Sequence, residues 1–352
     1  MIELNDLLVL SAKKGASDIH LVAGLAPILR IHKRLVHVGE ERLTPENIAE
    51  MVFSIMRDRQ KKLFQEKREY DFSYGVKGVA RFRINVFYQR GSIAAAFRRI
   101  PFEIPPLDSL GVPEIAHTLA NLERGFVLVT GPTGHGKSTT LASIIEEINK
   151  GKLKHIVTIE DPIEYLFQHK SSVVVQRELG TDTLSFPSAL RAVLREDPDV
   201  ILVGEMRDLD TIATALTAAE TGHLVFTTLH TNSAAQSIDR IVDVFPPHQQ
   251  EQVKTQLGGV LVAILSQQLI PRTDGSGLVL ATEVLVATPA IRNLIREGKT
   301  HMILSAIQTG SNMGMQTMEQ SLEKLAREGS ISYEDGLRYA FNPEDFRRLM
   351  GR

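Results

Sequence analysis

The sequence predicts an α/β protein with two domains, a small α+β domain followed by a larger domain built around a parallel β-sheet. Three observations support this prediction. After residue 113, short apolar runs alternate with helical stretches, as in parallel sheets covered by helices. Before residue 101, two strand-like runs flank a turn at Arg90 and Gly91, which indicates a β-hairpin. Residues 101–113 contain four prolines and are typical of a linker.

The first domain, residues 1–100, mixes strand and helix patterns. Residues 45–67 carry apolar side chains at helical spacing after the N-cap and N1 pair Thr44 and Pro45. Other segments read as strands, because they are short apolar runs or alternate with period two. These are residues 18–22, 27–32, 81–88 and 92–100.

The second domain, residues 114–352, holds the strand–helix alternation. Residues 137–149 form an amphipathic helix pattern that ends at Gly151. After residue 288 the chain is predicted to be helical, at 289–297 and at 315–328 with Gly329 as the C-cap. The predicted buried strands are 126–130, 156–159, 200–203 and 224–228.

Composition narrows the function. The chain has 352 residues, of which 43% are hydrophobic and 23% are charged, and its net charge is -2. That balance argues against a dedicated nucleic-acid binder, which usually carries excess basic charge. There is no cysteine, so disulfides, thiol catalysis and cysteine zinc sites are excluded. No signal-peptide pattern and no run of about 18 apolar residues occurs, so we expect a soluble protein without membrane insertion, in which any membrane link goes through a partner.

One segment matches the phosphate-binding pattern G-x-x-x-x-G-K-[ST] between a strand and a helix. Its glycines let the backbone wrap phosphate oxygens, and the helix N-terminus points free N–H groups at the anion. Lys137 is expected to neutralise the terminal phosphates of ATP, and Ser138 to offer its hydroxyl to Mg²⁺. The predicted nucleotide-binding residues are Gly131, Pro132, Thr133, Gly134, His135, Gly136, Lys137, Ser138 and Thr139.

Two acidic segments follow predicted strands. Glu205 ends the run DVILVGE, and strand ends of parallel sheets face the ligand, so Glu205 could hold Mg²⁺ through water. The segment IEDPIEY contains Glu160, Asp161 and Glu164, and we expect Glu164 to be the general base that takes a proton from water. The alternative for the first segment is an ordinary strand followed by a solvated loop, and for the second it is a solvated turn set by Pro162.

Histidines and arginines complete the candidate site. His223 and His230 frame the run HLVFTTLHT, and a neutral histidine can donate to a γ-phosphate, although polar residues are also common at strand ends. The hairpin carries four arginines, which usually form a solvated face. Hexameric ATPases, however, bring cations to the γ-phosphate from another domain or subunit. The hairpin arginines are Arg81, Arg83, Arg98 and Arg99.

Together these motifs resemble those of the ATPases of type II secretion and type IV pilus systems. The phosphate loop, the acidic box IEDPIEY, the Walker B segment ILVGEMRD and the histidine box HLVFTTLHT occur in that order and extend over nearly the whole chain. TPAIRNLIREGK at 288–299 and SAIQTG at 305–310 are similar to the signature of the members that retract pili. The lack of cysteine agrees with this, since many assembly ATPases carry a four-cysteine zinc site.

The resemblance implies a PAS-like first domain and a RecA-like second domain with a helical tail. It also implies a homohexameric ring that docks on the cytoplasmic face of the inner-membrane pilus platform. It carries over Lys137, Glu164, Glu205, His223 and His230 as active-site residues. Arg83 and Arg98 correspond to the phosphate-reaching arginines of the family.

The prediction that this motor retracts pili, and does not assemble them, rests in part on the predicted helix at 290–299. Its pattern places Arg292, Arg296 and Lys299 away from the apolar face, and we expect this basic face to couple ring motion to a partner. The plainer interpretation is a helix that only packs on its own domain. Other functions stay open: pilus assembly or type II secretion, a nucleic-acid translocase on a RecA-like core, and a subunit that binds ATP without turnover.

Overall fold

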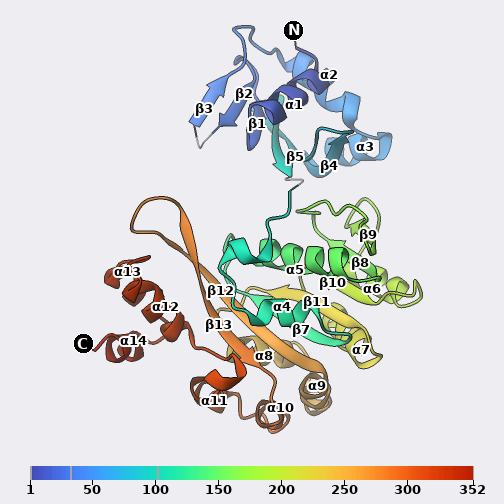
Figure 1. Cartoon of the computed structure of the whole chain (residues 1–352). Coiled ribbons are helices and arrows are strands. Elements are labelled where there is room, and N and C mark those ends of the chain that lie inside the picture. The colour runs from blue at the N-terminus through green and yellow to red at the C-terminus, as the bar shows by residue number, and fades with distance from the viewer. Residues whose placement is uncertain (1, 32–33, 101–102, 352) are drawn as a thin grey trace. The chain divides into compact units, whose positions relative to one another are not determined.

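The chain folds as two compact units. The computed structural model describes residues 2–31, 34–100 and 103–351 (Figure 1). The first unit comprises residues 1–103 with 164–166, and the second comprises residues 104–163 with 167–352. Residues 101 and 102 of the predicted linker and His32 of a predicted strand lie outside the described residues.

In its described residues, the first unit is an antiparallel sheet of six strands with three helices. The strand order is β3-β2-β1-β6-β5-β4, and the predicted hairpin is β5–β6, in which Arg83 pairs with Arg98. The strands are β1 (Asp18–Leu21), β2 (Ile28–Ile31), β3 (Arg34–His37), β4 (Glu69–Val76), β5 (Ala80–Gln89) and β6 (Ser92–Ile100). The helices are α1 (Leu4–Lys13), α2 (Pro45–Ile55) and α3 (Asp58–Lys67).

The predicted helix over residues 45–67 is two helices. Thr44 caps α2 through a capping box, as the pair with Pro45 suggests. Met56 and Arg57 are extended, with ψ of 136° and 155°, and Gln60 then accepts a hydrogen bond from the Arg57 backbone at 2.8 Å. The apolar period continues across this break, which is why the sequence pattern does not reveal it.

The second unit contains a seven-stranded sheet of order β13-β12-β7-β11-β10-β8-β9. Neighbouring strands run parallel, except for the antiparallel pair β12–β13. The predicted parallel sheet is therefore confirmed. The strands are β7 (Gly125–Thr130), β8 (His155–Glu160), β9 (Val173–Glu178), β10 (Val200–Val203), β11 (Leu224–Leu229), β12 (Leu261–Pro271) and β13 (Leu278–Val286).

Helices cover both faces of this sheet (Figure 1). Val127 and Val129 of β7 pack with α4 and α5, whereas Phe126 and Leu128 face the core shared by α6 to α10. The helices are α4 (Ile115–Ala120), α5 (Lys137–Gly151), α6 (Phe186–Val193), α7 (Leu209–Glu220), α8 (Ala234–Asp243), α9 (Pro247–Val260), α10 (Pro289–Arg296), α11 (Ile303–Thr309), α12 (Met318–Arg327), α13 (Tyr333–Tyr339) and α14 (Pro343–Leu349), with short 3-10 turns η1 (Leu107–Leu110), η2 (Thr300–Met302) and η3 (Ser311–Met313).

Strand β12 is the main element that the sequence patterns do not predict. Its apolar run is interrupted by Ser266, Gln267 and Gln268, yet all three are buried. Each has a polar partner: Ser266 accepts from Thr130 at 3.0 Å, Gln267 donates to Thr140 at 2.8 Å, and Gln268 donates to a backbone carbonyl at 3.1 Å. These polar side chains are stable in the core because their hydrogen bonds are satisfied there.

The C-terminal helices α12 to α14 gather beside the β12–β13 hairpin (Figure 1). Met318, Phe346 and Ile270 form a separate small core there. Leu107, from the predicted linker, is buried within the second unit. None of the helices in the part of the chain that the structure describes combines the length and apolar character needed to span a lipid bilayer.

Candidate active site

The phosphate-binding loop connects β7 to α5, at the carboxyl edge of the parallel strands. Gly131, Gly134 and Gly136 have φ of 136°, 81° and 82°, in the left-handed region that favours glycine. A Cβ at Gly131 would lie 2.3 Å from the carbonyl oxygen of Gln267. Gly131 is therefore required both by its φ and by the close approach of β12.

Lys137 begins α5 and turns its side chain back into the loop. Only 7% of its surface is exposed. Its Nζ donates to the carbonyls of Gly131 at 2.8 Å and Pro132 at 2.9 Å, and lies 3.4 Å from Nδ1 of His230. Thr133 Oγ1 is also 3.4 Å from that nitrogen. The ammonium group is thus held within the loop, where a phosphate could bind it.

Glu205 and His230 meet at the same edge, because β10 and β11 are parallel neighbours. Nε2 of His230 lies 3.0 Å from Glu205 Oε1, and Arg207 lies 2.7 Å from Oε2. Burial opposes ionisation of Glu205, but the hydrogen bond from Arg207 and the charges of His230, Arg207 and Lys137 outweigh it and lower its pKa. Glu205 is therefore a carboxylate at neutral pH.

Arg207 was not among the predicted site residues. The Glu205 hydrogen bond and charge raise the pKa of its guanidinium, so it stays protonated beside Glu205. Its only signal in the sequence is its place two residues after Glu205, in a loop between a buried strand and a helix.

His135 ties the loop to β12. Its Nδ1 accepts a hydrogen bond from the Leu269 backbone N–H at 2.9 Å. Burial and the nearby charge of Lys137 lower the pKa of the His135 imidazole, which keeps the ring neutral and able to accept. The sequence pattern leaves this position free, so only the structure reveals the tie.

The acidic box is divided between the two units. Glu160 ends β8 and is buried, and its Oε1 accepts hydrogen bonds from Thr158 at 2.7 Å and Gln176 at 3.1 Å. Its Cα lies 3.3 Å from where a Cβ of Gly204 would be, so it adjoins the Glu205 loop. Glu164 is exposed and groups with the first unit. Its role as the general base stays a prediction.

His223 does not join this cluster. It precedes β11, and its Nδ1 lies 2.9 Å from the Ala218 carbonyl oxygen and 3.1 Å from Thr221 Oγ1. His230 follows the same strand, and the six residues of β11 separate the two histidines by roughly 20 Å. The structure therefore places His223 at the opposite edge of the sheet from the loop of its own chain, which argues against the predicted contact with nucleotide there.

The two hairpin arginines of the candidate site lie in the first unit. Arg98 donates to Asp18 at 2.9 Å, and Arg83 lies 3.7 Å from Asp71. Both side chains are well exposed, at 74% and 48%. Their predicted contact with a γ-phosphate stays a prediction.

Mg²⁺ would need nucleotide oxygens to bind here. Within the described residues, no three His, Asp or Glu side chains are grouped to hold a metal ion. Ser138 lies in the first turn of α5, and Glu205 is ionised but already bonded by Arg207 and His230. Since Mg²⁺ keeps several waters and binds one or two protein groups plus phosphates, this donor set fits it.

Helix α10 shows that one predicted partner-facing arginine has an internal role. Nη1 of Arg292 donates to the carbonyls of Gly258 at 2.9 Å and Gly259 at 2.5 Å, and Nε donates to Ala287 at 2.9 Å. Gly258 and Gly259 lie at the C-terminal end of α9, whose last carbonyls lack helical donors. Arg292 therefore caps α9, whereas Arg296 and Lys299 are exposed.

Comparisons with known proteins agree with this geometry. The chain matches the family model of type II/IV secretion system proteins over residues 2–338. It is 50% identical to the type IV pilus retractation ATPase PilT of Pseudomonas aeruginosa, over 98% of this chain and 100% of the relative. It is 42% identical to the type IV pilus ATPase PilU of the same organism, over 99% and 91%.

A solved structure supports the same conclusion. The crystal structure of the pilus retraction motor PilT with bound ADP superposes with a TM-score of 0.92 at 51% identity, covering 99% of this chain and 100% of that one. The phosphate loop, the ionised glutamate and the histidine at the strand ends lie in a chain that matches these relatives along its length. The protein belongs to the family of type II/IV secretion system ATPases.

Proposed function

We propose that this chain is an ATP-hydrolysing motor that powers retraction of type IV pili. One observation carries the proposal: Lys137, Glu205 and His230 converge at the strand ends, in a chain similar over 98% of its length to a pilus retraction ATPase. The convergence supports the chemistry of phosphate binding. The similarity to a pilus retraction ATPase supports pilus retraction as the process that ATP hydrolysis drives.

Each site residue has its own role in binding or hydrolysing ATP. Loop N–H groups and Lys137 bind the β- and γ-phosphates, and Lys137 exchanges its carbonyl partners in the loop for phosphate oxygens. His230 lies between Lys137 and Glu205, so it can report loss of the γ-phosphate to Glu205. Glu164 takes the proton of the attacking water. Bound Mg²⁺ would neutralise phosphate charge, held by Ser138 and, through water, by Glu205.

We also propose a homohexamer in which Arg83 or Arg98 reaches a γ-phosphate across a domain or subunit boundary. Both guanidinium groups are exposed, and cations supplied from another subunit stabilise phosphoryl transfer in related chemistry. Mixing Lys137→Ala chains with Arg83→Ala or Arg98→Ala chains should give non-additive activity. A fully active monomer at high dilution would contradict the ring. The ring would act in the cytoplasm on an inner-membrane platform protein.

ATPase turnover of the purified chain, with and without DNA, tests the chemistry. We expect turnover that DNA does not stimulate and that Lys137→Ala abolishes, with the fold retained by circular dichroism. Stimulation by DNA would favour a nucleic-acid translocase. Binding of ATP without turnover would favour a regulatory subunit, and normal turnover by Lys137→Ala would refute the assignment of the loop.

Whether the motor retracts or assembles pili needs a separate test, because ATP hydrolysis can drive either process. Cells that lack this chain should keep surface pili but fail to retract them, measured by pilus counts and by twitching motility. Loss of surface pili on deletion would instead indicate pilus assembly, and a secretion defect with normal pili would indicate type II secretion.

A further inference from the structure

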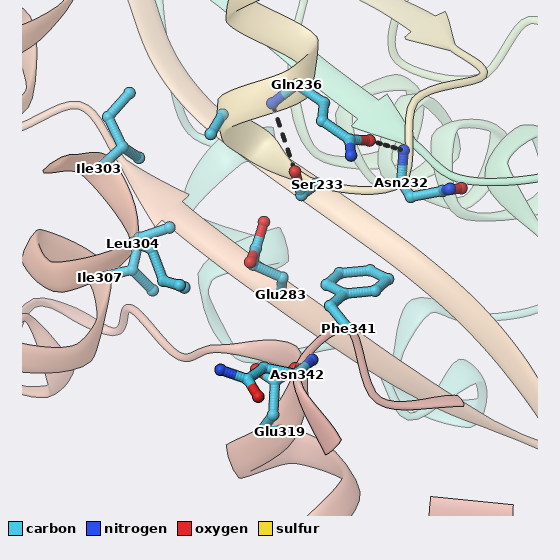
Figure 2. Close-up of a pocket in the computed structure, with 11 residues that line it drawn as sticks. Asn232, Ser233, Gln236, Glu283, Ile303, Leu304, Ile307, Glu319, Phe341 and Asn342 are labelled. Carbon is cyan, nitrogen blue, oxygen red and sulfur yellow. Dashed lines mark hydrogen bonds between the residues drawn. The ribbon is translucent and has the colours of Figure 1, made fainter. Parts of the chain in front are cut away.

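A pocket of about 330 Å³ lies within the second unit, and its described lining includes no residue of the phosphate loop. Its walls come from the start of α8, from β13, from helices α11 and α12, and from the turn between α13 and α14. Figure 2 shows two carboxylates and an apolar wall around it. The side chains used below are Glu283, Glu319, Ile303, Leu304, Ile307 and Phe341.

The two glutamates that line the pocket are almost fully buried. Glu283 is 2% exposed and Glu319 is 3% exposed. Each has one backbone donor: the Ala234 N–H bonds Glu283 Oε1 at 2.6 Å, and the Asn342 N–H bonds Glu319 Oε1 at 2.8 Å. Among the described residues that line the pocket there is no lysine, arginine or histidine. Two buried acids without a counter-charge are costly, so the pocket attracts a cation.

The electrostatic surroundings of Glu283 have the same imbalance. Burial raises its pKa to about 7, the Ala234 N–H lowers it in part, and the charge of Glu319 raises it further. Glu319 is the other titratable side chain lining the pocket, and the remaining polar lining groups are neutral amides and a hydroxyl. A bound cation would relieve the repulsion and hold Glu283 ionised.

The opposite wall is apolar and reaches the surface. Ile303 and Ile307 are buried, whereas Leu304 and Phe341 are 38% and 39% exposed. In Figure 2 the Phe341 ring and the α11 side chains flank Glu283. Large apolar side chains around a pocket with a few polar groups are typical of small-molecule sites, and this volume is at the lower end of their range.

We propose that this pocket binds a small organic cation, whose amine or amidine group lies by Glu283 and Glu319 and whose apolar body packs on Leu304 and Phe341. Charge selects the head of the ligand, because no cationic side chain is among the described residues that line the pocket. Shape and apolar area select its body. An inorganic cation would leave the apolar wall unfilled.

The pocket is also linked to the candidate active site through the chain. Ser233, which lines it and caps α8, follows His230 by three residues. The Ala234 N–H is held by Glu283 itself. A ligand at Glu283 therefore acts on the turn that positions His230, and we expect it to change ATP turnover. This consequence rests on the proposed function, whereas binding does not.

Isothermal titration of the full-length chain with benzamidine tests binding, with benzamide as the uncharged analogue of nearly the same shape. Benzamidine should bind at least tenfold more tightly than benzamide. Its affinity should rise roughly tenfold from pH 6 to pH 8, as Glu283 ionises. Glu283→Gln keeps an acceptor for the Ala234 N–H and should abolish the preference for benzamidine, and Phe341→Ala should weaken both ligands.

The matched control is Glu334→Gln, an exposed carboxylate on α13 outside the pocket, which should bind as the parent chain does. Thermal unfolding checks that each variant is folded. Equal affinity for the two ligands, no benzamidine binding at millimolar concentration, or unchanged binding by Glu283→Gln would overturn the proposal. Binding without a change in ATP turnover would overturn only the link to His230.

Discussion

The first prediction concerns the close approach of the phosphate loop to β12. Gly131→Ala places a Cβ 2.3 Å from the Gln267 carbonyl oxygen, at a φ of 136°. Neither atom can move alone, because the Cβ is fixed to the backbone that directly follows β7 and the oxygen belongs to the backbone of β12, which pairs with β7. Gly134→Ala is the matched control: its φ is 81°, but its Cβ would meet nothing within 4 Å.

The expected loss in the free energy of unfolding follows from the geometry at each of these two glycines. Backbone strain at a non-glycine residue costs on the order of 1–3 kcal/mol, and overpacking against fixed atoms adds about 1–3 kcal/mol. Gly131→Ala should therefore lower the free energy of unfolding by about 2–6 kcal/mol. Gly134→Ala carries only the strain, about 1–2 kcal/mol.

Urea unfolding followed by circular dichroism measures the difference, provided that the m-value is unchanged. ATP affinity by titration gives a second readout. Displacing β12 also disturbs the loop, so Gly131→Ala should bind ATP more weakly than its stability loss alone explains. If the two variants unfold at the same urea concentration, the loop is not confined by β12 and the argument fails.

Three further predictions follow from the placement of single side chains. Arg292→Ala should destabilise the chain by about 1.5–3 kcal/mol, since it removes charged hydrogen bonds that cap α9. Arg296→Ala, the control, should leave the unfolding midpoint unchanged. Equal destabilisation by the two substitutions would refute the capping role of Arg292. Glu283→Gln should stabilise the chain increasingly as pH rises from about 4.5 to 7, because folding raises the pKa of Glu283 from its ordinary 4.5 to about 7. Above pH 7 the gain in the free energy of unfolding should reach about 3 kcal/mol, at 1.36 kcal/mol per pKa unit. A gain that shrinks as pH rises would contradict the burial argument. Glu164→Gln should reduce ATP turnover by about 10²-fold or more with ATP binding retained; normal turnover in this variant beside an inactive Glu160→Gln would move the general base to Glu160.

Local patterns were sufficient for the elements whose signal is contained in a few neighbouring residues. The phosphate loop is one, because its glycines, its lysine and the helix start that binds the anion are contiguous. The hairpin β5–β6 is another, since period two and a short turn determine its pairing. Parallel β7, β8, β10 and β11 followed from apolar runs between helices.

Other features of the site and fold were determined only by the tertiary structure, because they depend on residues far apart in the chain. His223 and His230 look equivalent in the sequence, but a strand has two ends, and only His230 lies at the edge with Lys137. Arg292 has its partners some 34 residues away, at Gly258, so its capping role has no local signal. The pocket acids Glu283 and Glu319 are likewise brought together by packing of separate elements. Periodicity reports which face of an element is buried, whereas partners across the fold depend on how the elements pack.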